Sequence, residues 1–371
     1  MSAAPRGGAA ADGRDVAIVG GGLVALASAA ALSARGAAVT LVAHRQPGEA
    51  SPAAAGMLAP GVERAEGPAH DFAIAARDLY PGYVDAIAEL TGIRVPLNRD
   101  GILELVGDER EADARRRDLP PHARWLSARE LRELEPGAAP MAGALFHPRD
   151  GAVDNVVLVR ALRKLVEASS SVTIVEEPAA AVDAGESRPA VHLASGGRIS
   201  ADTLVLAAGA WTPLLGGLPR AIPVEPVRGQ MIAVAATPLR HVAYGAGHGY
   251  LVPRAQGVSV VGSTMEHVGF EVDTTTEGVA SLVRIAGAIA PSLADVPALD
   301  RWSGLRPVTP DFLPIIGPDP DAPSLLYATG HSRNGILLAP LTGECVARLA
   351  CGEPLEHDLS PFSITRFEAA G

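Results

Sequence analysis

Short apolar runs and longer apolar stretches alternate at the beginning of the chain, with glycines between them. The apolar run Asp15–Val19 precedes three glycines and an alanine- and leucine-rich stretch to residue 35, and a second apolar run covers 39–42. We predict a strand, a helix that ends before Gly36, and a second strand. This order, within about 28 residues, is typical of a βαβ unit with parallel strands.

The same patterns predict the elements of the rest of the chain. Ser127, with Glu130 three residues later, has the arrangement of a capping box at the start of a helix. Further helices are expected at 69–90, 156–168 and 335–349, and an exposed helix or loop at 108–118. Strands are expected at 172–175, 203–207, 230–234, 250–252, 258–261 and 325–329, with a hairpin-like stretch over 189–206.

These elements indicate an α/β fold with two interleaved domains, a Rossmann-like one assembled from discontinuous segments and a β-rich one on an antiparallel sheet. Nucleotide-binding signals occur at both ends and in the middle of the chain, and the β-rich block at 222–272 lies between them. We assign 14–80, 145–220 and 300–371 to the cofactor domain, 81–144 and 221–299 to the substrate domain, and 1–13 to a disordered tail.

Composition excludes several classes of protein. The 371 residues are 48% hydrophobic and 20% charged, which is typical of a globular protein. The net charge is −11 and no block of five Lys or Arg occurs, so nucleic acid and anionic membranes are not expected partners. The first dozen residues lack the apolar core of a signal peptide, and no apolar run is long enough to span a bilayer. We expect a cytoplasmic protein.

Two cysteines, Cys345 and Cys351, are too few for a disulfide framework. We expect two reduced, partly buried thiols. No metal-ligand spacing and no Ser-His-Asp arrangement stands out, so no metal site is expected.

Gly20-x-Gly22-x-x-Ala25 is a dinucleotide-binding fingerprint placed between the first strand and the first helix. The first glycine permits a sharp turn, and the second lets a pyrophosphate lie against the backbone. The third small residue lets the helix pack close to the sheet, and the amino end of the helix faces the phosphates.

The carboxylate expected at the end of the second strand to bind the ribose hydroxyls is missing. Ala43 occupies that place, followed by His44 and Arg45. Arg45 would suit the 2′-phosphate of NADP, whereas His44 or backbone groups would cover the ribose of FAD. The fingerprint alone leaves both cofactors open.

A series of further motifs decides for FAD, because together they resemble the glycine oxidase branch of the D-amino-acid oxidase superfamily. In order along the chain, they are Ser51-Pro-Ala-Ala-Ala-Gly-Met-Leu-Ala-Pro60, 143–154, 205–211, Arg228-Gly-Gln-Met231, 250–254, 262–265, 304–311, 314–317 and 328–340. The resemblance covers about 14–350. It implies a GR2-type FAD-binding domain and a β-rich substrate-binding domain. Neither cysteine lies where the related sarcosine oxidases tether their flavin, so FAD is expected to be non-covalent.

Oxidation of an amino acid needs its carboxylate fixed, and the planar fork of an arginine matches two carboxylate oxygens. Arg306 matches the carboxylate-binding position of the family, and Arg333 and Tyr250 match further positions in the pocket. A solvated arginine or a core tyrosine is the alternative for each. Met57 and Met265 are expected to line the pocket, with core filling as the alternative.

The turn from Gly330 to Gly335 is expected to direct backbone N–H groups at the flavin. His331 is expected to contact the flavin or to be structural, rather than to act as a general base. The resemblance and the fingerprint together give these expected cofactor contacts: Gly20, Gly22, Ala25, His44, Arg45, Ser51, Ala54, Gly56, Met57, Gly209, Trp211, His331, Arg333, Asn334, Gly335 and Ile336.

The resemblance implies oxidation of glycine or a similar small amino acid to an imine, which hydrolyses to a 2-oxo acid and ammonia while O₂ becomes H₂O₂. It also implies transfer of the imine to a thiazole synthase in thiamine synthesis, and a homo-oligomer. Pro52 and Ser332 replace the aromatic residues usual in the family and would widen the pocket. A dehydrogenase, an oxidase of a larger or N-methylated amine, and a non-catalytic protein with a decayed site are the alternatives.

Overall fold

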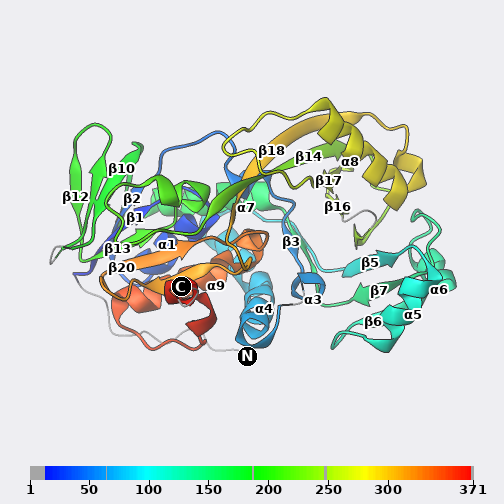
Figure 1. Cartoon of the computed structure of the whole chain (residues 1–371), viewed down its shortest axis with the longest axis horizontal. Coiled ribbons are helices and arrows are strands. Elements are labelled where there is room, and N and C mark those ends of the chain that lie inside the picture. Colours follow the sequence, from blue (N-terminus) through cyan, green and yellow to red (C-terminus); the bar gives the residue numbers. More distant parts are fainter. Residues whose placement is uncertain (1–12, 64, 186–187, 246–248, 369–371) are drawn as a thin grey trace.

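A six-stranded sheet forms one half of the molecule in the computed structural model, which describes residues 13–63, 65–185, 188–245 and 249–368 (Figure 1). Five of its strands are parallel, and β19 at one edge is antiparallel. In spatial order the strands are β19 (Ile315–Pro318), β20 (Leu325–Thr329), β13 (Thr203–Leu206), β1 (Asp15–Val19), β2 (Ala38–Val42) and β9 (Val172–Val175). The predicted parallel pairing of β1 with β2 is confirmed.

Both faces of this sheet are covered, which explains why its strands have continuous apolar sequences. Val16 and Ile18 of β1 face a layer of helices, while Ala17 and Val19 face the opposite side. The helices are α1 (Leu23–Ser33), α4 (Gly67–Thr91), α7 (Asn155–Ala168) and α9 (Gly335–Cys351). A three-stranded sheet of β10 (Ala179–Asp183), β11 (Ala190–Leu193) and β12 (Arg198–Ser200) covers the other face.

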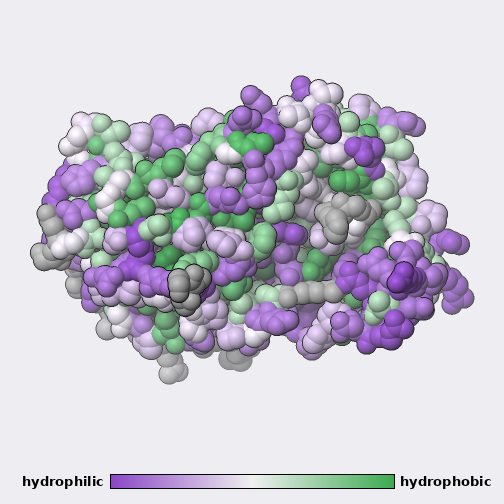
Figure 2. Space-filling model, viewed as in Figure 1, coloured by the Kyte–Doolittle hydropathy of each residue, from purple (hydrophilic) through white to green (hydrophobic). Residues whose placement is uncertain are grey.

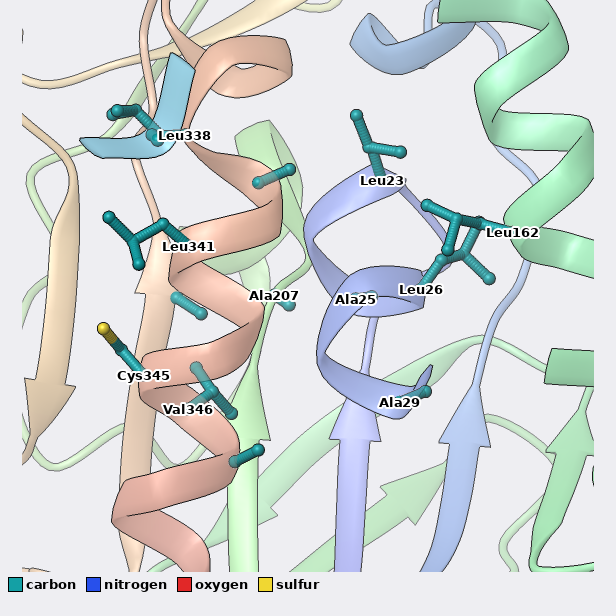
Figure 3. Packing of buried hydrophobic residues seen from close by; sticks show 14 of the residues in the cluster. Leu23, Ala25, Leu26, Ala29, Leu162, Ala207, Leu338, Leu341, Cys345 and Val346 are labelled. Carbon is teal, nitrogen blue, oxygen red and sulfur yellow. The ribbon is translucent and has the colours of Figure 1, made fainter. Parts of the chain in front are cut away.

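Close packing of α1 holds the fingerprint turn against the sheet. Figure 3 shows Leu23 and Leu26 of α1 directed toward Leu162 of α7, with α9 on the other side of α1. The small side chain of Ala25 is fully buried in this cluster. Cys345 is buried and Cys351 is half-buried, and both are free thiols on α9.

A mostly antiparallel sheet of eight strands forms the other half of the molecule. Its order is β18 (Ala298–Val308), β14 (Glu225–Val234), β17 (Ser259–Gly262), β16 (Tyr250–Pro253), β15 (Val242–Tyr244), β5 (Ile102–Val106), β7 (Gly143–His147) and β6 (Arg124–Ser127). Helices α6 (Ala128–Leu134) and α8 (Thr276–Ile289) pack on it. A small sheet of β3 (Met57–Leu58), β8 (Gly151–Val153) and β4 (Leu97–Asn98) completes the strands.

Side-chain caps mark the start of the helix at 128–134 and of the charged segment at 108–118. The predicted capping box of Ser127 and Glu130 is confirmed at the start of α6. The charged segment is a helix, α5 (Glu109–Arg117), capped by Asp108, and Figure 2 shows a hydrophilic surface over this region. Helix α1 ends two residues earlier than expected.

Two long elements of the second half were not predicted, α8 and β18. Strand β18 contains polar residues, a glycine and a proline, which are poor strand formers, yet it pairs with β14 along its whole length. Tertiary pairing therefore decides its conformation. The domain boundaries expected at 80/81, 144/145 and 299/300 fall inside α4, β7 and β18, so the division into segments stays a prediction. Within the described ranges, no helix combines the length and apolar character that a membrane span requires.

Candidate active site

A cavity of about 460 Å³ lies where the carboxyl ends of the parallel strands meet the edge of the second sheet. The segments that follow β1, β2, β9, β13 and β20 form one part of its wall, and residues of β14, β16 and β18 form another. Open α/β sheets bind ligands outside the carboxyl ends of their strands. The topology therefore makes this cavity the candidate active site.

The fingerprint turn is a cradle made of backbone. Gly20 has φ +135°, and a Cβ atom there would lie 2.3 Å from the carbonyl oxygen of Ala207. Gly22 precedes α1, and the N–H of Leu23 donates to Ser51 Oγ at 2.9 Å. The amino end of α1 thus borders the cavity beside a hydroxyl group, as a phosphate site requires.

The end of β2 offers few polar groups. Ala43 is buried, and His44 lines the cavity. Arg45 is exposed and is absent from the lining, so the structure gives it no contact with the cavity. Ala25 does not line the cavity either, because it packs beneath the turn. All other residues expected to contact the cofactor or the substrate line the cavity.

The turn after β20 places another helix end at the cavity. Asn334, Gly335 and Ile336, at the amino end of α9, line it, and Asn334 makes no side-chain cap. His331 is buried, with Nε2 3.1 Å from Thr342 Oγ1, and burial lowers the pKa of its imidazole to about 3. A neutral imidazole of such low basicity does not suit a general base at neutral pH.

Arg306 reaches the cavity from β18. Its guanidinium lies across Gly229 of β14, where a Cβ atom would be 2.1 Å from Nη1. It donates to Ser263 Oγ at 2.6 Å and to the carbonyl oxygen of Thr264 at 3.2 Å. No carboxylate of the described residues lies within 4 Å of it. Burial lowers the pKa of Arg306, and nearby Tyr250 opposes that effect.

Arg333, by contrast, already has a carboxylate partner within the protein. Its Nη2 lies 2.9 Å from Glu63 Oε1, and about two fifths of its side chain is exposed. Burial raises the pKa of the Glu63 carboxyl group, and Arg333 opposes that rise. No local sequence pattern indicates Glu63, because its partner Arg333 lies 270 positions later in the chain.

Apolar side chains surround the two arginines. Met57, Met265 and Tyr250 line the cavity as expected, together with Met231, whose sulfur accepts the Tyr250 hydroxyl at 3.5 Å. Met265 is 48% exposed and lies at the surface of the protein. Ser332 is buried and also lines the cavity. Pro52 is exposed and does not line it, so that replacement does not widen the pocket.

Three side chains that sequence analysis did not identify hold the 51–55 segment. Asn155 donates to the carbonyl oxygen of Ser51 at 2.8 Å, Arg254 to that of Ala55 at 3.0 Å, and Trp302 to that of Ala53 at 2.9 Å. These bonds satisfy carbonyl groups in a segment that lines the cavity. They keep it in place between the two sheets.

The residues present fit the FAD that the resemblance implies. A Cβ at Gly20 would meet the Ala207 carbonyl and one at Gly22 would approach the Ser51 hydroxyl, so this turn is built for glycine, and the amino ends of α1 and α9 suit negative charge. The cavity extends from the fingerprint turn to Arg306, so one elongated ligand can reach both. Among the described residues, no group of three or more His, Cys, Asp or Glu is arranged to hold a metal ion.

The chain is similar over most of its length to known flavin enzymes. It is 38% identical to the bifunctional protein ThiO/ThiG of Synechocystis sp., over 94% of this chain and 53% of that protein, so it spans about half of that relative. It is 35% identical to glycine oxidase of Geobacillus kaustophilus, over 95% of this chain and 97% of that enzyme.

Solved structures agree with the sequence comparison. The crystal structure of the Geobacillus kaustophilus glycine oxidase has a TM-score of 0.88 at 33% identity, covering 95% of this chain and 98% of that one. Iminodiacetate oxidase from Chelativorans sp. BNC1 has a TM-score of 0.85 at 26% identity, covering 94% and 98%. These likenesses confirm the predicted α/β fold with its two kinds of sheet.

A family model described as FAD dependent oxidoreductase matches residues 15–349. The cofactor is therefore FAD, and the NADP alternative that Arg45 raised is wrong. The chain belongs to this family, DAO, of FAD-dependent oxidoreductases.

Proposed function

We propose that this enzyme oxidatively deaminates glycine or a similarly small amino acid. The amino acid, O₂ and water give a 2-oxo acid, ammonia and H₂O₂. The observation that carries the proposal is the guanidinium of Arg306, which lines the same cavity as the glycine cradle and has no carboxylate within 4 Å among the described residues.

Arg306 is the substrate anchor in this proposal. Ser263 and Thr264 already hold its guanidinium, so little side-chain freedom is lost when a carboxylate binds. Burial makes the charge of Arg306 costly without a partner, and an anionic substrate removes that cost. The carboxylate is thereby fixed in one orientation, which fixes the adjacent Cα and amino group.

FAD, when bound, supplies the oxidising chemistry by accepting a hydride from the substrate Cα and by reacting with O₂. The protein supplies orientation and exclusion of water. Tyr250, Met57 and Met231 give the cavity an apolar wall near Arg306, which suits a short aliphatic side chain. His331 stays neutral and holds the turn before α9 through Thr342. The proton released from the amine passes to solvent in this proposal.

The relatives support the proposal and extend it. Two of them are named glycine oxidase or carry a ThiO part, and in the Synechocystis protein that part is joined to ThiG in one chain. We infer that this enzyme also hands its imine to a thiazole synthase for thiamine synthesis, and that it forms a homo-oligomer. The cytoplasmic location expected from the sequence stays a prediction, which cell fractionation would test.

A second candidate is the oxidation of a larger N-substituted glycine. The fold likeness to iminodiacetate oxidase and the small side chain of Ser332 at the cavity favour it. Arg333 is the group that would meet a second carboxylate of such a substrate, in competition with Glu63.

The test is an absorbance spectrum of the purified flavoprotein before and after anaerobic addition of glycine, sarcosine, D-alanine or iminodiacetate. Bleaching by glycine, with recovery and H₂O₂ when air is admitted, supports the proposal. Bleaching by iminodiacetate or sarcosine alone favours the second candidate. Bleaching without peroxide indicates a dehydrogenase, and protein that binds FAD but is reduced by none of the four contradicts both candidates.

A further inference from the structure

The missing acid at Ala43 leaves the ribose of FAD without its usual acceptor, and the neighbouring strand offers a replacement. Strand β9 runs parallel to β2 at the edge of the sheet, with Val175 opposite Val42. The N–H of Ala43 donates to the carbonyl oxygen of Val175 at 2.9 Å. The segment after β9 therefore leaves the sheet beside Ala43.

Glu177 lies two residues beyond that carbonyl group, half-buried, and lines the cavity. The adjacent Glu176 is exposed and is bound by Arg163 at 2.6 Å. Over the ranges the structure describes, Glu177 itself makes no hydrogen bond or ion pair. A carboxylate without a partner at the cavity wall, on the strand next to Ala43, is available to a ligand that donates hydrogen bonds.

The other carboxylates of the cavity wall are placed elsewhere. Glu63 is engaged by Arg333. Glu49 accepts the N–H of Gln46 at 3.0 Å, and its loop is tied to β18, because the N–H of Leu305 donates to the Gly48 carbonyl at 2.8 Å. Glu49 thus lies toward the substrate sheet, whereas Glu177 follows the outermost strand of the nucleotide-binding sheet.

We propose that Glu177 binds the adenosine ribose of FAD in place of the missing acid at Ala43. The ribose diol offers two O–H donors, and a carboxylate is the strongest acceptor for them among protein side chains. The same negative charge would repel a 2′-phosphate, so it also selects against NADP-type ligands. In this proposal the ribose acceptor follows β9 instead of its neighbour β2.

The first experiment measures ligand affinity rather than turnover. Apoprotein is titrated calorimetrically with FAD, ADP and FMN, for the unaltered protein, Glu177→Ala and the control Glu176→Ala. We expect Glu177→Ala to weaken FAD and ADP binding about tenfold and to leave FMN, which lacks adenosine, unchanged. Glu176→Ala should change none of the three. Equal loss for FMN, or no loss for FAD and ADP, would overturn the proposal.

A second measurement identifies the atoms involved. Removal of the ribose hydroxyl in 2′-deoxy-ADP should weaken binding to the unaltered protein and have little effect on Glu177→Ala, because the acceptor is already absent. An equal loss in both proteins would place Glu177 away from the ribose. The double variant Ala43→Glu, Glu177→Ala returns the acid to the first strand and should restore most of the FAD affinity. The assignment would also be rejected if the double variant did not regain FAD affinity and 2′-deoxy-ADP lost the same affinity in both proteins.

Discussion

The two ends of the cavity are built in different ways. At the nucleotide end the wall is mostly backbone: a glycine turn at φ +135°, helix amino ends and short side chains. At the substrate end it consists of long side chains, Arg306, Arg333 and Tyr250, held by strands and by one carboxylate. A wall made of backbone keeps its shape only if the glycines and short residues of the turn are retained. The specificity of a wall made of side chains can be altered by a single substitution.

This difference explains how a family can keep one cofactor and vary its substrate. In the proposed function, groups made of backbone bind the part of the cofactor that does not change. In the same proposal, the side chains of β18 and of the turn after β20 decide which substrate is oxidised. Substitutions at the two ends are therefore expected to separate into losses of FAD and losses of substrate.

The largest effect is expected at Gly20. In Gly20→Val, the added side chain would collide with the Ala207 carbonyl and oppose the positive φ, at a cost of more than about 3 kcal/mol, and would block the cradle. We expect the purified variant to lack flavin, as measured by absorbance, and to be less stable, as measured by the midpoint of urea unfolding. The control Gly36→Ala also places a side chain at positive φ, but meets no atom within 4 Å. It should lose about 1 kcal/mol and keep FAD. Flavin retention by Gly20→Val would refute the cradle.

The next largest effect is expected at the substrate end of the cavity and should leave the nucleotide end intact. Arg306→Ala removes the proposed anchor, so KM for the amino acid should rise about 100-fold while bound FAD remains. Arg306→Lys keeps the positive charge without the planar fork, so its KM should lie between those of the unaltered protein and Arg306→Ala. Arg301→Ala, an exposed arginine on the same strand, is the control and should be neutral. Flavin loss in Arg306→Ala with unchanged KM would reverse the assignment.

A smaller effect should sharpen the contrast between the two arginines. Glu63→Gln frees Arg333, so the cavity becomes more positive, and we expect KM for iminodiacetate to fall about fivefold relative to that for glycine. Steady-state kinetics with both substrates measures the ratio. Glu133→Gln breaks an exposed pair with Arg129 and should leave the ratio unchanged. An unchanged ratio in Glu63→Gln would show that Arg333 does not meet the second carboxylate.

The last effect does not involve ligand binding and concerns stability and pH. Burial holds the pKa of His331 at about 3, so the unfolded chain binds a proton between that value and about 6.5, whereas the folded protein does not. Stability should therefore fall by about 2 kcal/mol from pH 7 to pH 5 through this group, measured by urea unfolding. His331→Asn should remove that part, and the exposed control His267→Asn should not. If the free energy of unfolding had the same pH dependence in His331→Asn and in the unaltered protein, this prediction would be wrong.

Much of the fold could be predicted because its signals are local. The Gly20 turn, the parallel pairing of β1 with β2 and the capping box of α6 each depend on residues that lie close together in sequence. Strand β18 could not, since its polar residues form a strand only against β14.

The candidate site divides in the same manner. The glycines and the helix ends followed from the fingerprint and the family motifs. Glu63 and Glu177 did not, because one is defined by an ion pair across the chain and the other by the neighbour of its strand. Neither residue belongs to a motif, and only the tertiary arrangement of the chain brings them to the cavity.

Strand β18 also limits how such an enzyme can change over evolutionary time. Trp302 holds the 51–55 segment and Arg306 faces the cavity, and these two side chains lie on one face because successive strand residues alternate. Inserting or deleting one residue between them would turn Arg306 to the opposite face. A change of one residue in length is thus excluded between these two positions, so new specificities are expected to arise by substitution or by changes in the loops around the strand.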